Sequence, residues 1–414
     1  MRRGLLRNTA WTLCAFGIAV AVPACGSSED PNTIGQGPEG PGQSSGQPGD
    51  PGQTQPPTPE EQVKEILDQR KLDYGEAART AKLKLNDELP NLEEIKQIEA
   101  AANDAAKKVA YEALVDKWIE DPKFARTMVK FWKDTFRMGQ VGAVQQGRPD
   151  KDRAPNFAAQ VTVEGRKYTD ILTATQDTCP TFDEATNTFT AGSCNTSPTV
   201  GVITDPGLLS HYFANMAFRR VRFIQETFVC SKFPAAYSAT PKPMGNGTYT
   251  GMHPFESIAG KANNPNARVD FHDTQAVICA NCHNDLNHIT PLFLNYDQNG
   301  ALQATPQVKV PIPGNPDARP DDYLPAGEGL AWRFGTPITD MASLGAAVAA
   351  DAEVPRCAVN RVWNYAFSRG DIVNDLATVP NAVTDPYVQR FVANGMKLKE
   401  TIREVFKGED FVRF

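Results

Sequence analysis

The sequence lacks any apolar run that could cross a membrane, and it also lacks an excess of positive charge. Its apolar stretches stay below the roughly 18 residues that a membrane-spanning helix needs. The 414 residues include 42 Lys and Arg against 49 Asp and Glu, which gives a net charge of −7. A surface this acidic repels phosphate backbones, so the composition excludes nucleic acid as the main partner. Internal repeats, phosphate-binding loops, G-x-S-x-G elbows and zinc-protease helices are also missing, so a hydrolase has no support.

Residues 1–24 have the layout of a secretory signal peptide. Three arginines and no acidic residue accompany an apolar stretch from Trp11 to Val22, and this is a basic region followed by a short apolar one. The segment ends at Cys25, and Val22-Pro23-Ala24-Cys25 resembles a bacterial lipobox, in which the cysteine becomes the acylated first residue. The proline departs from the usual residue at its position, so plain cleavage stays an alternative. We expect Cys25 to carry the lipid.

Residues 25–59 predict a flexible linker. Between residues 26 and 59, Gly, Pro, Ser and Gln make up 25 of 34 residues, and no aromatic residue occurs. Such a segment cannot bury enough surface to offset the entropy lost on ordering. As a coil it spans about 30 Å, and fully extended about 100 Å. The sequence therefore predicts a body tethered outside the cytoplasm, in the cell envelope.

Six of the eight cysteines remain after Cys14 leaves with the signal and Cys25 is acylated. In an exported protein, cysteines are expected to be oxidised or covalently used. Cys179 and Cys194 bracket a polar, turn-rich loop, so a local disulfide between them is expected, worth roughly 3 kcal/mol. Cys230 and Cys357 then pair by elimination, since the last two cysteines belong to the motif below. Free buried cysteines are the alternative to this second bridge.

Residues 279–283 read Cys-Ala-Asn-Cys-His, the C-x-x-C-H attachment site of c-type haem. On one helical turn, Cys279 and Cys282 reach the two vinyl groups of one porphyrin edge, and His283 then faces the iron as the proximal ligand. The region of Pro291 is expected to turn back and offer a carbonyl to the other imidazole nitrogen. Two other interpretations compete: a redox dithiol, which lacks a thioredoxin-like context, and a zinc site that adds His288 and His272.

The distal iron ligand is harder to assign from the sequence. His272 lies seven residues before Cys279 and is the first choice. Met341, the Met252-His253 pair and an open or water-ligated site are alternatives. His288 lies five residues after His283 on the same expected helix and should stay on the proximal side. Aromatic residues near the motif, Phe271, Phe293 and Tyr296, are expected to bury the ring.

The body from residue 60 onward is dominated by helical periodicity, so we expect a mainly α fold, a helical bundle with a haem segment in its second half. The expected division is an N-terminal helical domain, 60–232, and a haem-binding helical domain, 233–414. A loop insertion at 140–205 includes a small β-hairpin expected at 161–165, where Val161-Thr162-Val163 alternates before Glu164-Gly165. The expected helical stripes are Tyr111, Leu114, Val115, Trp118; Phe124, Met128, Phe131, Trp132; Val359, Val362, Trp363, Ala366, Phe367; and Leu398, Ile402, Val405, Phe406.

Local signals complete these expectations. Asp121-Pro122 is expected to cap and begin a helix, and Gly370 and Gly408 to end two later ones. Residues 208–229 are expected to form one long apolar-periodic segment, whose Arg219, Arg220 and Arg222 form a solvated or propionate-facing side. Residues 295–300 copy the first half of a calcium loop, but the twelfth position is proline, so a polar turn is expected instead.

Several segments together resemble a known family. They are Leu85–Glu94, Asp121–Trp132, Gly207–Cys230, Cys279–Gly300 and Pro355–Phe367. In this order they resemble the planctomycete- and myxobacterial-type cytochrome c proteins with associated domains of unknown function. The resemblance implies a mainly helical exported protein with a covalent haem c, and a histidine shortly before the motif, matching His272. Region 140–205 departs most from it, and the resemblance implies no substrate.

The sequence therefore predicts a lipid-anchored monohaem c-type cytochrome that transfers electrons at the cell envelope, as an outer-membrane lipoprotein facing the periplasm or the cell surface. Its partners would be a redox protein of the envelope and the lipid bilayer, through acylated Cys25. The alternatives are a peroxidase- or oxidase-like haem enzyme with an open distal site and a surface binding or scaffold protein with a structural haem.

Overall fold

The computed structural model describes residues 65, 69–232, 243–244, 247–248, 268–269, 271, 277–310, 314–324 and 327–414, and among these the backbone alone for 243–244, 247–248, 277–282, 284 and 334. The expected signal peptide, Cys25, the linker, His272 and the Met252-His253 pair lie outside the described residues. Residues 64–414 form one compact unit. Among the described residues, no helix is both long and apolar enough to cross a bilayer.

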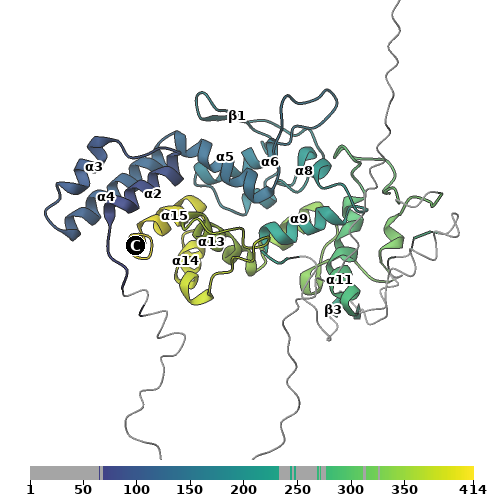
Figure 1. Cartoon of the computed structure of the whole chain (residues 1–414). Coiled ribbons are helices and arrows are strands. Elements are labelled where there is room, and N and C mark those ends of the chain that lie inside the picture. Colours follow the sequence, from purple (N-terminus) through teal and green to yellow (C-terminus); the bar gives the residue numbers. More distant parts are fainter. Residues whose placement is uncertain are drawn as a thin grey trace, which may run out of the picture. The chain divides into compact units, whose positions relative to one another are not determined.

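The unit is mainly helical, as the periodicity predicts (Figure 1). The helices of its first half are α2 (Tyr74–Asn86), α3 (Leu92–Glu99), α4 (Asp104–Glu120), α5 (Lys123–Phe136), α6 (Arg153–Val163), α7 (Asp170–Thr173), α8 (Pro206–His211) and α9 (Phe218–Phe228). The second half contributes α11 (Val277–Phe293), α12 (Met341–Ala349), α13 (Glu353–Ala366), α14 (Asn381–Ala393), α15 (Leu398–Lys407) and the 3-10 turns η1 (Pro320–Asp322) and η2 (Arg333–Gly335).

Strands are few and short in the described part of the chain. Three antiparallel pairs join β1 (Thr181–Asp183) to β2 (Thr188–Thr190), β3 (Pro243–Met244) to β4 (Gly247–Thr248) and β5 (Ala331–Trp332) to β6 (Thr336–Pro337). In the first pair, Phe182 lies opposite Phe189, and their rings are 4.9 Å apart. The fold therefore depends on helix packing.

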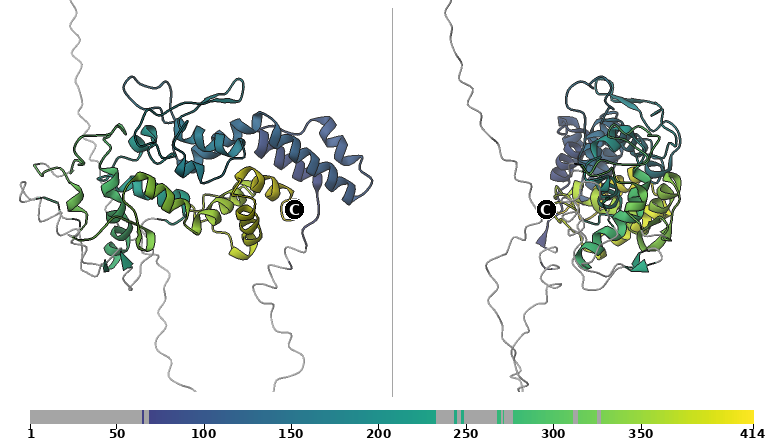
Figure 2. Two further views of the ribbon diagram at one scale, coloured as in Figure 1. Left: turned by 180° about the vertical axis from the view of Figure 1, so that it is seen from behind. Right: turned by 90° about the vertical axis from the view of Figure 1, so that its right-hand side faces the viewer.

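The helices pack in two neighbouring rows (Figures 1 and 2). α2, α4, α5 and α6 form one row, while α15, α13 and α9 lie beside it, with α15 against α4 and α6 and α9 against α5. The two ends of the unit lie side by side. Lys71 N donates to Phe414 O at 2.9 Å, and Phe414 N donates to Lys71 O at 3.0 Å. Helices from both sides of residue 232 thus share one compact unit, and the expected division at that residue stays a prediction.

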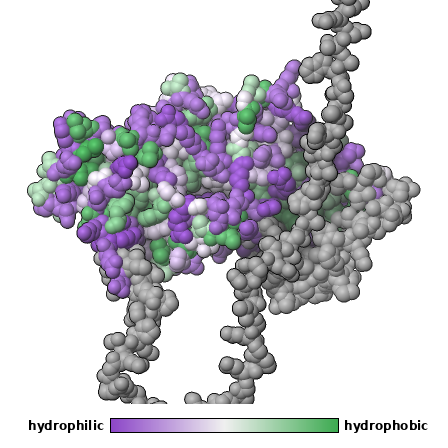
Figure 3. All heavy atoms as spheres, in the orientation of Figure 1, coloured by the Kyte–Doolittle hydropathy of each residue, from purple (hydrophilic) through white to green (hydrophobic). Residues whose placement is uncertain are grey.

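The expected buried stripes are confirmed. Trp118, Phe124, Met128 and Trp132 are each at most 1% exposed. Helix α5 begins at Lys123 with Pro122 as its N-cap, so Asp121 is not the cap as expected, although its Oδ1 accepts from Lys123 N at 2.9 Å. On the face that Figure 3 shows, hydrophobic and hydrophilic side chains of the described helices are interspersed.

Three further local expectations are wrong. Residues 161–163 end helix α6 and form no hairpin, because Val161 and Thr162 are both buried within a helical stripe and Gly165, at φ +64°, ends it. The hairpin of this region lies instead at β1–β2. Residues 208–229 form two helices, separated by a left-handed turn over 215–217.

The third error concerns a helix end. α13 stops before Gly370, because Ser368 already takes the left-handed conformation, at φ +52°. Gly408 does follow the end of α15, as expected. The polar turn at 295–300 is confirmed, with Asp297 Oδ1 accepting from Asn299 N and Ala301 N.

Candidate haem-attachment site

The five residues of the C-x-x-C-H motif lie on helix α11, which runs from Val277 to Phe293. Positions 279, 282 and 283 fall within about 100° of arc on a helix of 3.6 residues per turn. The three positions therefore share one side of α11. The side chains of Cys279 and Cys282 are outside the described part of the structure.

The imidazole of His283 is held in one orientation by Asn287, one helical turn later. His283 Nδ1 lies 3.0 Å from Asn287 Oδ1, and Asn287 Nδ2 donates to Phe271 O at 3.0 Å. Because the amide nitrogen is used by Phe271, the oxygen faces His283, and Nδ1 must carry the hydrogen. The lone pair of the neutral ring is then on Nε2, the atom that a metal would use.

Aromatic rings surround this histidine. Phe218, the first residue of α9, meets His283 edge-on at 5.3 Å between ring centroids. Phe271 lies 6.4 Å away, nearly parallel to the imidazole, and Tyr323 stacks on Phe271 at 4.6 Å. Burial lowers the pKa of His283, and the Asn287 hydrogen bond only opposes this effect. The site therefore favours a neutral imidazole.

Two expectations about the proximal side are wrong. Pro291 does not turn the chain back, because it lies inside α11, which continues to Phe293. The partner of the second imidazole nitrogen is Asn287 rather than a carbonyl near Pro291. The i, i+4 spacing of His283 and Asn287 on one expected helix was the signal that could have identified it.

Arg220 also differs from its expected role. It is fully buried and donates to the carbonyls of Leu209, Phe293, Tyr296 and Asp297, at 2.6–2.9 Å. It therefore fixes the C-terminal end of α11 instead of facing solvent or a propionate. Its neighbours Arg219 and Arg222 are exposed, as expected of a solvated side.

The remaining candidates lie apart from His283 or outside the described residues. His288 is 2% exposed, and its Nε2 lies 3.1 Å from Glu328 Oε2, so a carboxylate already accompanies it. Met341 is buried at the start of α12, a helix that packs mainly against α7 and β5. Of the expected aromatic residues, Phe271 contacts His283, whereas Phe293 lies ten residues, or about 15 Å, further along α11. His272, the first choice for distal ligand, falls outside the described residues.

Both expected disulfides are confirmed. Cys179 joins Cys194, with Cα atoms 5.0 Å apart, and Cys230 joins Cys357, with Cα atoms 5.4 Å apart. The first bridge closes the short segment 179–194 inside the region 140–205, and the second ties the end of α9 to α13.

The acid beside the first bridge, Asp205, was not predicted from the sequence. Asp205 Oδ2 lies 3.2 Å from Cys179 Sγ and 3.9 Å from Cys194 Sγ. Within the described residues these three groups are close enough to hold a metal, but both sulfurs are used in the disulfide. A disulfide sulfur carries no hydrogen, so only a protonated Asp205 can donate to it. Burial, aided by Asp150, raises the pKa of Asp205 to about 7, in agreement with that donor role.

Comparisons with known proteins identify no relative, since no family model, no curated protein and no solved structure matches this chain.

Proposed function

We propose that this protein is an exported, lipid-anchored monohaem c-type cytochrome that transfers electrons at the cell envelope. Cys279 and Cys282 would hold the haem by thioether bonds, and His283 would be the proximal iron ligand. The haem would supply the one-electron chemistry, while the chain buries and orients it. The resemblance to cytochrome c proteins with domains of unknown function agrees with this proposal.

The observation that carries the proposal is the environment of the His283 imidazole, that is, its hydrogen bond and its aromatic neighbours. A histidine with Nδ1 committed to Asn287 and surrounded by Phe218 and Phe271 presents Nε2 as a preorganised metal ligand. A histidine with only a structural role would be expected to use both nitrogens in hydrogen bonds. The C-x-x-C spacing on the same helix supports covalent haem ahead of the zinc site that the same residues could also form.

The location is part of the same proposal. The signal-like residues 1–24, Cys25 and the linker to residue 59 would place the body outside the cytoplasm, tethered to the outer membrane. Haem attachment takes place outside the cytoplasm, so export and C-x-x-C-H support each other. An envelope redox protein would be the partner.

The test is to produce the full chain in a host with cytochrome c maturation and to measure intact mass and the pyridine haemochrome spectrum. We expect one covalent haem per chain, lost in Cys279→Ser with Cys282→Ser. His288→Gln, on the same helix, is the matched control for His283→Gln and should retain a proximally ligated spectrum. A colourless protein with two free or zinc-bound thiols would overturn the proposal.

Asn287→Leu sharpens this test. Removing the acceptor of Nδ1 makes the imidazole a weaker donor to iron, so the reduction potential should rise, with haem content unchanged. Binding of carbon monoxide or cyanide by the wild type would instead favour the alternative, a haem enzyme with an open distal site. His272→Ala should change the spin state if His272 is the distal ligand.

A further inference from the structure

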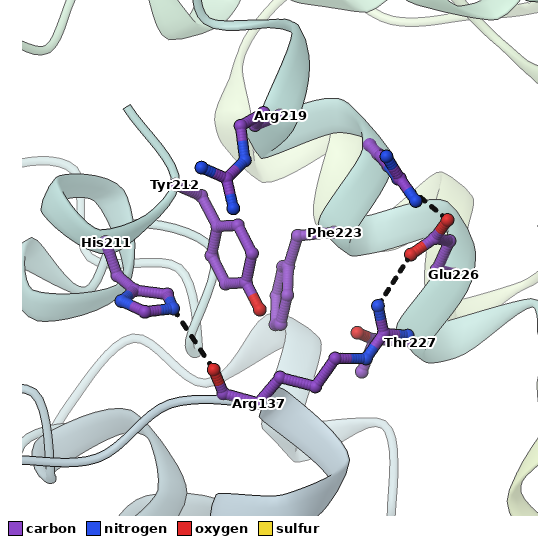
Figure 4. Close-up of a pocket in the computed structure, with 8 residues that line it drawn as sticks. Arg137, His211, Tyr212, Arg219, Phe223, Glu226 and Thr227 are labelled. Carbon is purple, nitrogen blue, oxygen red and sulfur yellow. Dashed lines mark hydrogen bonds and ion pairs between the residues drawn. The ribbon is translucent and has the colours of Figure 1, made fainter. Parts of the chain in front are cut away.

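A pocket lies between the end of α5, α8 and α9, and His283 does not line it (Figure 4). Its volume is about 180 Å³, and its lining is formed by Arg137, His211, Tyr212, Arg219, Arg222, Phe223, Glu226 and Thr227. The residues that surround His283, among them Phe218 and Asn287, do not line it. Any function of this pocket is therefore independent of the proposed haem.

The backbone of Arg137 brings α5 and α8 together at this pocket. Arg137 is the C-cap of α5 and takes the left-handed conformation, φ +49°, which a residue other than glycine rarely adopts. In this conformation its carbonyl accepts from His211 Nε2 at 3.1 Å. Its side chain meanwhile crosses to α9, where Nη1 donates to Glu226 Oε2 at 2.9 Å.

Helix α9 supplies the opposite wall. Arg219, Arg222, Phe223, Glu226 and Thr227 recur at helical spacing, so one face of α9 lines the pocket. Glu226 is 2% exposed and also accepts from Arg222 Nε at 2.8 Å, which fixes two arginines at once. The Arg219 guanidinium extends over the ring of Tyr212, 5.7 Å from its centre, and has no ion pair within the described part of the chain (Figure 4).

The pocket has more positive charge than its own acid can neutralise. Three arginines face one glutamate, a net charge of +2. Burial, with Lys151 and Arg219 nearby, lowers the pKa of His211, so the histidine adds no charge at neutral pH. Nε and Nη2 of Arg137 are buried and have no hydrogen-bond partner among the described residues. Buried donors of this kind are normally satisfied by a water or a ligand.

The volume limits what such a ligand can be. Sites for drug-sized molecules measure roughly 300–1,000 Å³, so a nucleotide is too large for this pocket. A few waters or one small ion would fit. Guanidinium groups bind planar or tetrahedral oxyanions in preference to halides, because their donors are arranged as a fork.

We propose that this pocket binds a small dianionic oxyanion, either an inorganic phosphate or a short dicarboxylate, between Arg219, Arg222 and Arg137. Arg219 supplies the accessible donors at the mouth, and Arg137 supplies the buried ones. Glu226 positions Arg137 and Arg222. Two excess positive charges match one dianion.

The test is to titrate the full chain at about pH 8, where inorganic phosphate is mainly a dianion, by calorimetry and by the midpoint of thermal unfolding. Succinate is the dicarboxylate arm, and sodium chloride of equal ionic strength is the screening control. We expect phosphate or succinate, but not chloride, to bind and to raise the midpoint. Arg219→Gln should weaken binding by about tenfold or more, the loss of one charge-assisted donor.

Arg79→Gln is the matched control, because Arg79 is an exposed arginine on α2 that pairs with Glu76 and with no other acid among the described residues. It should bind the anion as the wild type does. Arg222→Gln repeats the test at a second exposed position of the pocket. Stabilisation by chloride equal to that by both dianions, or Arg219→Gln and Arg222→Gln proteins that bind as tightly as the wild type, would overturn the proposal.

Discussion

Glu94 in the first helices and two buried side chains near α8–α11, Arg220 and Asp205, make their hydrogen bonds with different kinds of partner. Glu94, 3% exposed, accepts mainly from side chains: Lys82 Nζ at 2.6 Å, Trp118 Nε1 at 2.9 Å and Lys117 Nζ at 3.1 Å. In the second region, Arg220 donates only to backbone carbonyls, and Asp205 accepts from Leu208 N at 2.7 Å.

This difference has a physical consequence. Charges that meet side chains form a network whose members can be replaced together at a small cost. A charged side chain whose hydrogen bonds are all with the backbone has no partner that a substitution can remove, because the backbone carbonyls and amides stay in place. Arg220 therefore determines the path of the chain, and Asp205 fixes the start of α8 by accepting from Leu208 N. Glu94 and Lys82, by contrast, form an ion pair between helices whose apolar stripes already define their packing.

The largest expected effect is that of Arg220→Met. The substitution keeps the apolar volume but leaves four buried carbonyls without their donor, and the free energy of unfolding should fall by about 5 kcal/mol. Urea unfolding monitored by circular dichroism measures it. Arg219→Gln, at the adjacent exposed position, should change stability by no more than about 0.5 kcal/mol. Similar small losses in both variants would contradict the backbone-fixing role of Arg220.

Asp205→Asn tests the second of these buried side chains through the pH dependence of stability. Since the pKa of Asp205 is about 7 in the folded protein, the folded state retains a proton that the unfolded chain releases near pH 4. Stability should therefore fall as pH rises from about 4 to about 7, by as much as about 4 kcal/mol. Asparagine cannot titrate and still caps α8 by accepting from Leu208 N, so the variant should lose this fall and be the more stable protein at pH 8.

Thermal or urea unfolding at a series of pH values between 4 and 8 gives this result directly. Asp183→Asn, an exposed acid on the neighbouring strand β1, should leave the wild-type slope unchanged in that window, because the amide of Ala185 lowers the pKa of Asp183. A variant with the same slope as the wild type would show that Asp205 is ionised beside the disulfide.

The same contrast separates the features that could be predicted from the sequence from those that could not. Helix stripes such as Phe124–Trp132 and both disulfides follow from periodicity and cysteine spacing, which are local or countable signals. The position of the C-x-x-C-H motif on a helix was predictable for the same reason. Asn287 was within reach, because it lies four residues after His283 on that helix.

Contacts made through the backbone left no sequence signal. Arg220 looks like its exposed neighbours Arg219 and Arg222, and only the break between α8 and α9 turns it inward. That break uses Asn215, Met216 and Ala217 in left-handed conformations, with no glycine to indicate it. The pocket at Arg137 depends on a left-handed arginine, which is equally absent from sequence patterns.

Of the three substitutions, Glu94→Gln is expected to change the free energy of unfolding least. It tests the region in which a buried charge is bound by side chains. Burial alone would raise the pKa of Glu94, but hydrogen bonds from Lys82, Trp118, Asn91 N and Lys117 outweigh it and lower the pKa to about 2. The carboxylate thus contributes stability at and above pH 4.5 that is lost as pH falls toward 2, at most about 3 kcal/mol. The variant should be less stable than the wild type by that amount at pH 7 and equal to it near pH 2.

The matched control for this variant is Glu93→Gln, because Glu93 is an adjacent, exposed acid whose ion-pair partner in the described part of the chain is Lys96. It should change stability by less than about 0.5 kcal/mol at either pH. The double variant Glu94→Gln with Lys82→Met should recover part of the loss, because it removes the lysine left buried without its counter-charge. No comparable second substitution exists for Arg220, whose partners are peptide carbonyls. Recovery of stability in the Glu94→Gln with Lys82→Met double variant would establish that the side-chain network around Glu94 can be replaced as a whole. Arg220, whose charge is bound to the backbone, is instead part of the fold itself.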